Sequence, residues 1–135
     1  TWPLRFDELV QPVLDRQCVS CHRPGNADAK AARLDLTPDK AYPSLLGYGN
    51  LRGLAGERDR SVVGQGPARN SNLLTLLNKP GGHEGVRLSP EDLYRLIVWM
   101  DVYAHRQGSF SPEQELDLRK MREAWAGLLE PGTQK

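Results

Sequence analysis

One short motif constrains this chain more than any other feature: Cys18-Val19-Ser20-Cys21-His22. It places two thiols at the end of one helical turn, with an imidazole directly after them. This spacing is typical of covalent haem attachment, in which both thiols form thioether links to the haem vinyl groups and the histidine reaches the iron from the same side. We therefore expect one haem c, attached through Cys18 and Cys21 and ligated by His22.

Two other readings of the motif are a redox-active disulfide and half of a zinc site. The chain has only 2 cysteines, whereas structural zinc needs about four ligands. A thioredoxin-like disulfide expects a β-α-β context, which the helical pattern of this sequence lacks. Haem attachment of this kind takes place on the export side of bacterial membranes. We therefore expect a periplasmic or extracellular protein.

Composition excludes several other classes of protein. The 135 residues fit a single domain, and 18 Lys and Arg balance 17 Asp and Glu, so no basic field points to nucleic acid. No apolar run approaches the roughly 20 residues that span a bilayer. The first residue is Thr, so we expect that a signal peptide or a larger parent protein has been removed. The 39% hydrophobic content is lean, and an apolar cofactor at the centre would complete the core.

The N-terminal segment predicts a helix over residues 6–17, because its apolar residues follow the spacing of one buried face. These are Phe6, Leu9, Val10, Val13 and Leu14. Pro12 lies inside the segment and predicts a kink or a break. A short helix is expected from Asn70 or Ser71 to about Leu77.

Two further helices begin with the same signal, a serine followed by proline. Ser89 is expected to cap a helix that ends at Gly108. Ser111 is expected to cap a last helix that ends at Pro131. The apolar residues available for burial in these two helices are Leu93, Leu96, Ile97, Met100, Tyr103, Ala104, Leu116, Leu118, Met121, Trp125, Leu128 and Leu129.

The segment from Arg23 to Arg69 is rich in glycine and proline and shows little periodicity. We expect a long loop there, with short helical turns after Thr37 or around residues 42–46. Loops of this length in compact domains usually wrap something or move. A haem would be covered by such a loop.

The order of these elements is similar to class I cytochrome c: helix, C-x-x-C-H, long loop, short helix, ligand-bearing loop, capped helix. The resemblance implies an all-α fold whose first and last core helices cross. We expect a cytochrome c-like haem domain over residues 1–110. Residues 111–135 would form a helical extension packed on the same domain.

Three stretches also resemble planctomycete-type cytochromes, in particular the C-terminal haem domain of hydrazine synthase alpha-subunit-like proteins. The stretches are LVQPVLDRQCVSCH (9–22), ARLDL (32–36) and HEGVRLSPEDLYRLIVW (83–99). The resemblance covers roughly residues 4 to 110. It implies that two histidines ligate the haem iron and that the domain transfers electrons.

In class I cytochromes the second axial ligand lies in the loop before the final core helix. The corresponding loop here, residues 80–88, contains no Met but contains His83, beside glycines that let the backbone bend. His83 is therefore the predicted ligand. The alternatives are His105, which a helix end explains as a surface cap, and Met100 and Met121, which we interpret as core residues.

Several further residues are candidates for contact with the haem. Arginines of the covering segment could pair with the propionates: Arg33, Arg52, Arg58, Arg60 and Arg69. Aromatic residues could pack on the macrocycle or fill the core: Tyr42, Tyr48 and Trp99. The sequence favours no one of them.

Two imidazoles would fill both axial positions of the iron and leave one-electron exchange as the available chemistry. The expected function is electron transfer, at low potential, between redox partner proteins or an adjoining redox domain, and not catalysis. One alternative is a peroxidase or small-gas sensor with a labile or vacant distal position. Another is a haem that only holds the core together.

Overall fold

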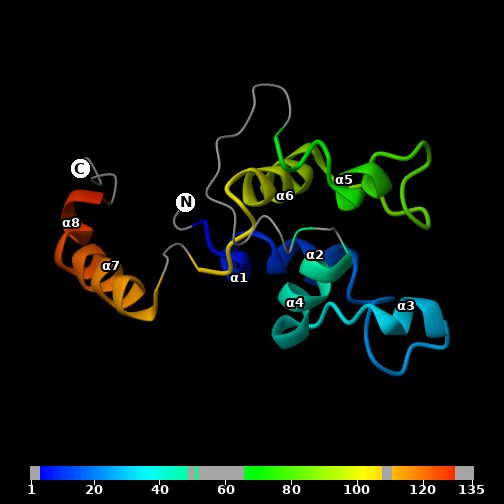
Figure 1. Cartoon of the computed structure of the whole chain (residues 1–135), viewed down its shortest axis with the longest axis horizontal. Helices are drawn as coiled ribbons and strands as arrows, with labels where there is room; N and C mark the ends of the chain where they lie inside the picture. The colour runs from blue at the N-terminus through cyan, green and yellow to red at the C-terminus, as the bar shows by residue number, and fades with distance from the viewer. Residues whose placement is uncertain (1–3, 49–50, 52–65, 108–110, 130–135) are drawn as a thin grey trace, which may run out of the picture.

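The computed structural model describes residues 4–48, 51, 66–107 and 111–129, and within them the chain is helical and contains no strand. The all-α class predicted from the sequence is therefore confirmed (Figure 1). The helices are α1 (Phe6–Leu9), α2 (Gln11–Gln17), α3 (Ala29–Arg33), α4 (Pro38–Tyr48), α5 (Asn72–Leu77), α6 (Pro90–Asp101), α7 (Pro112–Ala124) and α8 (Ala126–Leu129).

The predicted N-terminal helix is divided into α1 and α2 at Val10, so the break predicted from Pro12 is confirmed. Pro12 is the second residue of α2, where a backbone N–H has no intrahelical partner to lose. Phe6, Val10 and Val13 are fully buried. The face predicted from the apolar spacing is thus the face that packs on the core.

Helix α6 starts as predicted, with Pro90 as its first residue and the Ser89 hydroxyl accepting a hydrogen bond from the Asp92 N–H at 3.1 Å. Helix α1 packs against α6. At this contact the Phe6 ring lies edge-on to the Trp99 ring, with centroids 5.2 Å apart. Trp99 and Met100 are fully buried. The contact between these two helices is therefore part of the hydrophobic core.

The end of α6 differs from the prediction. The helix ends at Asp101, well before Gly108, which lies outside the described residues. Tyr103 and Ala104 adopt positive φ, and the Ala104 N–H donates to the Trp99 carbonyl at 2.9 Å. The Ala104 carbonyl then accepts a hydrogen bond from the hydroxyl of Tyr42. The predicted end of the helix was wrong because this tertiary hydrogen bond holds residues 103–104 outside the helix. Sequence periodicity does not reveal such a bond.

The predicted long loop after the C-x-x-C-H motif contains two helices in its described part. Helix α4 begins at Pro38, where a short helical turn was predicted after Thr37, but it is longer than a turn, and α3 was not predicted. Asp28 caps α3 by accepting hydrogen bonds from the N–H groups of Lys30 and Ala31. Helix α4 is 11 residues long, buries Ala41 and Leu45, and packs on α2. A short apolar face and Pro43 inside the helix hid the length of α4 from the periodicity argument.

Helix α5 begins after Ser71, as predicted, with the serine hydroxyl accepting a hydrogen bond from the Leu74 N–H. The predicted last helix is also present as α7, capped by Ser111, and continues as the short α8.

Figure 1 shows α7 and α8 away from the other helices. Arg5 and Glu115 form an ion pair between α7 and the N-terminal segment. Met121 and Trp125 are 53% and 57% exposed, so the expectation that they would be buried was wrong. Glu115 is instead the buried residue of α7, and its ion pair with Arg5 joins the helix to the N-terminal segment. Packing of the whole extension, residues 111–135, on the domain stays a prediction.

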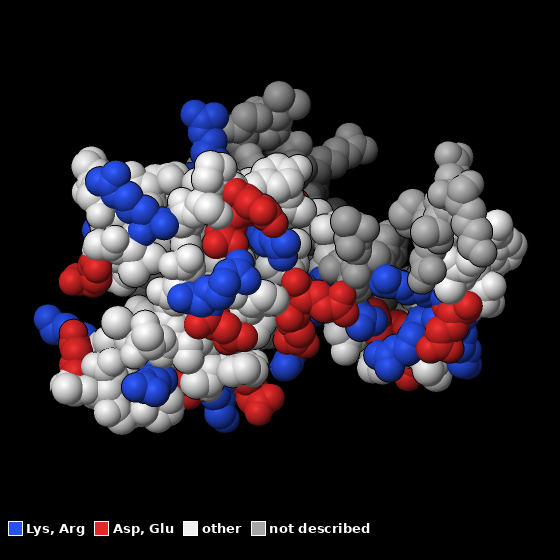
Figure 2. All heavy atoms as spheres, turned by 180° about the vertical axis from the view of Figure 1, so that it is seen from behind, with Lys and Arg blue, Asp and Glu red and all other residues white. Residues whose placement is uncertain are grey.

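Charged side chains are mixed on the surface. Figure 2 shows Lys and Arg lying beside Asp and Glu over the face turned to the viewer, without a large patch of one sign. This agrees with the near balance of 18 basic and 17 acidic residues in the sequence.

Candidate functional site

The C-x-x-C-H motif continues the turn that ends α2. Cys18 is the residue after the helix, and its carbonyl accepts hydrogen bonds from the N–H groups of Cys21 at 3.1 Å and His22 at 2.9 Å. Both cysteines are free thiols, Cys18 partly buried and Cys21 exposed. The His22 carbonyl accepts from the Leu36 N–H at 3.0 Å, which ties the motif to the segment between α3 and α4.

The ring of His22 has a defined orientation. Its Nδ1 lies 3.1 Å from the carbonyl oxygen of Ala31 in α3. A carbonyl can only accept a hydrogen bond, so Nδ1 carries a hydrogen, and in the neutral imidazole the lone pair is then on Nε2. In such a histidine Nε2 is available to bind a metal ion, while the backbone carbonyl that accepts from Nδ1 fixes the orientation of the ring.

His83 lies in a tight hairpin between α5 and α6. Its N–H donates to the Val86 carbonyl at 3.2 Å, and the Val86 N–H donates back to the His83 carbonyl at 2.8 Å. The two residues between them, Glu84 and Gly85, have φ of 48° and 79°, the pattern of a two-residue hairpin turn in which both central residues are left-handed. The hairpin therefore fixes the backbone from which the His83 side chain projects.

The structure brings the rings of His22 and His83 close together with nearly parallel planes, although 60 residues separate them in the sequence. Their ring centroids are 5.9 Å apart and their planes differ by 18°. Rings in direct contact would be closer, since carbon atoms touch at about 3.5–4.0 Å. An imidazole nitrogen lies about 2 Å from a bound metal ion and the ring centre about 1 Å further, so two imidazoles on opposite sides of one ion would have centroids roughly 6 Å apart. The observed centroid distance agrees with that spacing.

A cavity of about 660 Å³ contains the two rings, and its volume is within the range of about 300–1,000 Å³ found for small-molecule and cofactor sites. Cys18, His22 and His83 line it, whereas Cys21 is not among the lining residues. Most of the remaining wall is aliphatic: Leu14, Leu34, Leu36, Leu45, Leu73, Leu76, Leu77, Leu88 and Leu96. An apolar cavity with two opposed imidazoles fits a haem, which is a flat apolar macrocycle with iron at its centre.

The other candidate iron ligands do not line this cavity. Met100 is fully buried in the core beside Trp99, which confirms its interpretation as a core residue. Met121 is exposed on α7, so the same interpretation was wrong for Met121. His105 follows the end of α6, where its carbonyl accepts a hydrogen bond from Trp99 Nε1 at 2.9 Å.

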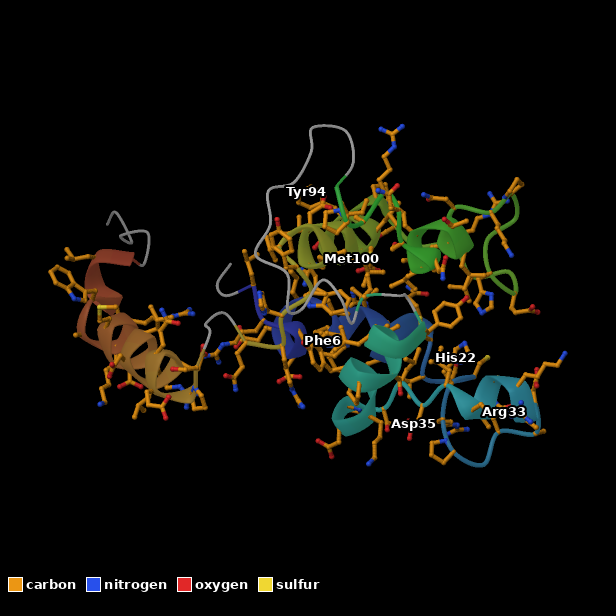
Figure 3. All side chains as sticks on the ribbon, viewed as in Figure 1. Phe6, His22, Arg33, Asp35, Tyr94 and Met100 are labelled. Carbon is orange, nitrogen blue, oxygen red and sulfur yellow. The ribbon has the colours of Figure 1, made fainter. Side chains whose placement is uncertain are left out.

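The remaining candidates divide between cavity and core. Tyr48 lines the cavity, whereas Tyr42 and Trp99 pack with Phe6 in the core. Arg33 also lines the cavity, and Figure 3 shows it at the same end of the body as His22. Arg69 is exposed and is not among the lining residues, and Arg52, Arg58 and Arg60 lie outside the described residues.

Sequence reasoning missed one charged residue of the cavity wall, Lys30. It lies three residues before Arg33, a spacing that places both side chains on one face of a helix. That signal was hidden because the segment was predicted to be a loop.

Burial raises the pKa of the Cys18 thiol to about 11, with smaller contributions from the neighbouring Cys21 and from the carboxylate of Asp92. Asp92 is itself held by Arg16, whose Nη2 lies 2.5 Å from its Oδ1. The Cys18 thiol is therefore protonated at neutral pH. Redox-active cysteines usually have a lowered pKa, so the raised pKa of Cys18 is unlike that of a redox-active disulfide. Within the described ranges, no group of three or more His, Cys, Asp or Glu is arranged to hold a metal ion.

Comparison with known proteins gave no match to a family model, a curated protein or a solved structure. In the part of the chain that the structure describes, no helix has both the length and the apolar character needed to cross a bilayer.

Proposed function

We propose that this chain is a class I-like c-type cytochrome domain that carries single electrons between redox partners outside the cytoplasm. One haem would be attached through Cys18 and Cys21, with its iron between His22 and His83. The observation that carries the proposal is the pair of nearly parallel imidazoles, 5.9 Å apart, inside an apolar cavity. When bound, the haem supplies reversible one-electron exchange between ferric and ferrous iron.

The residues around the cavity have distinct roles in this proposal. The hydrogen bond from His22 Nδ1 to the Ala31 carbonyl holds the first imidazole in the orientation that ligation requires. The hairpin hydrogen bonds between His83 and Val86 fix the backbone that carries the second. With both imidazoles holding the iron, the chain would leave no ligand position to a substrate or a gas. This favours an electron carrier over a peroxidase or a sensor.

The apolar wall contributes to the same function. Leucines from α2, α4, α5 and α6 line the space beside the two imidazoles and make its wall apolar. Cys18 also lines this space, where it would be joined to the haem as a neutral thioether. A preformed site changes little between oxidation states, as electron transfer without catalysis requires.

Substitution of His83 by Ala in the haem-loaded chain tests the ligand assignment, with His105→Ala as the matched control. We expect His83→Ala to convert the visible spectrum from low spin to high spin and to let the ferrous protein bind carbon monoxide rapidly. His105→Ala should leave both properties unchanged.

A low-spin spectrum that survives His83→Ala would contradict the assignment. Rapid carbon monoxide binding by the unaltered protein would favour the enzyme or sensor instead. Electron exchange with a soluble redox protein, followed by stopped flow, separates a relay from a haem that only stabilises the fold. The proposal requires that exchange to occur.

A further inference from the structure

The otherwise apolar cavity has one charged edge. Among the described residues that line it, Lys30 and Arg33 are the charged side chains. Both belong to the five-residue helix α3 and lie one turn apart. The positive charge of the cavity is therefore gathered on one short helix.

Helix α3 is fixed relative to the imidazole of His22. Its N-terminus is capped by Asp28, whose Oδ1 accepts a hydrogen bond from the Lys30 backbone N–H at 2.8 Å. Its Ala31 carbonyl accepts the hydrogen bond from His22 Nδ1 at 3.1 Å. The position of the two cations relative to the imidazole that faces the cavity is thus set by backbone contacts.

Within the described residues, neither Lys30 nor Arg33 has a carboxylate partner, whereas Arg16 and Arg95 each have one. Two cations one helical turn apart also repel each other. A ligand with an apolar body and carboxylates at one edge would complement both the wall and the charges. A guanidinium group is well suited to such a partner, because its fork matches the geometry of a carboxylate.

We propose that Lys30 and Arg33 bind the propionate carboxylates of the haem and thereby fix which edge of the macrocycle faces α3. This inference rests on the proposed function. The two cations compensate the negative charge of the carboxylates close to the iron. Their removal leaves that charge uncompensated and favours the more positive, oxidised iron, so the reduction potential falls.

The test compares two double variants of the haem-loaded full chain by potentiometric titration. Lys30→Gln/Arg33→Gln removes the cavity cations. Lys40→Gln/Lys79→Gln removes the same net charge from exposed positions that are not among those lining the cavity. At low ionic strength we expect a clear shift of the first variant to lower potential and a much smaller shift of the second. High salt should shrink the difference, since exposed charges are screened.

Equal shifts in the two variants would overturn the inference, because only the net charge would then matter. A shift of the first variant that salt does not reduce would also overturn it. The visible spectrum of each variant separates this outcome from failure of the proposed function. Failure of the proposed function would appear as absent haem or a high-spin spectrum in the unaltered protein.

Discussion

Substitution of Gly82 by Ala adds only one methyl group but should strongly destabilise the hairpin that carries His83. Gly82 has φ of +79°, a conformation that costs an L residue about 1–2 kcal/mol. A Cβ there would also lie 2.2 Å from the carbonyl oxygen of Val86, which is far inside contact distance. To relieve the overlap the hairpin must open, and its two hydrogen bonds between His83 and Val86 contribute about 0.5–1.5 kcal/mol each.

The expected loss of unfolding free energy is therefore about 2–5 kcal/mol. Gly81→Ala and Gly85→Ala are matched controls. Both glycines also have positive φ, but a Cβ at either position would meet nothing within 4 Å. These controls should lose only the conformational term, about 1–2 kcal/mol. The difference of about 1–3 kcal/mol corresponds to roughly a 5- to 140-fold change in the hairpin equilibrium.

Guanidinium titration of each variant measures the loss of unfolding free energy, and the visible spectrum measures the high-spin fraction. Gly82→Ala should lower the unfolding free energy most and raise the high-spin fraction, since the opened hairpin withdraws His83. The reasoning is refuted if Gly82→Ala and Gly85→Ala lose the same free energy. The reasoning is also refuted if Gly82→Ala loses more unfolding free energy than its controls but keeps a fully low-spin spectrum.

Two further predictions concern the core and the thiols. Trp99→Ala should lower the unfolding free energy by about 3–5 kcal/mol, because it empties a fully buried position. Trp125→Ala, at an exposed position, should change the unfolding free energy by less than about 0.5 kcal/mol. Chemical denaturation measures both. The pKa of Cys18 is raised from its ordinary value of 9.0 to about 11, so the folded chain favours the neutral thiol. A folded chain with free thiols, checked by circular dichroism, should keep this contribution to stability below pH 9 and lose it as the pH rises toward 11. The haem-attached chain, whose Cys18 cannot ionise, should lack that loss; an identical pH profile for the two forms would contradict the environment described for Cys18.

Local sequence signals predicted the helix starts well. Ser71, Ser89 and Ser111 each cap a helix through the side-chain hydrogen bond expected of them. The break associated with Pro12 also follows from covalent geometry, because proline has no N–H to donate. These features depend on a few neighbouring residues, and such residues are visible in the sequence.

Features set by distant contacts could not be predicted in this way. Helix α6 ends early because the Ala104 carbonyl accepts a hydrogen bond from the hydroxyl of Tyr42, which lies 62 residues earlier in the sequence. The exposure of Trp125 likewise depends on where α7 lies, which its own periodicity does not determine. The site shows the same division: motif spacing and loop position pointed to His22 and His83, whereas only the folded chain shows how close their rings lie and brings Lys30 to the cavity wall.

The central claim is that one iron lies between the imidazoles of His22 and His83, and low-temperature EPR of the ferric full-length chain tests it most directly. The planes of the two rings differ by only 18°. Nearly parallel imidazoles split the iron dπ orbitals unequally, so the account predicts a low-spin spectrum of the ordinary rhombic kind. A high-spin signal, or the strongly anisotropic low-spin signal of perpendicular imidazoles, would contradict it.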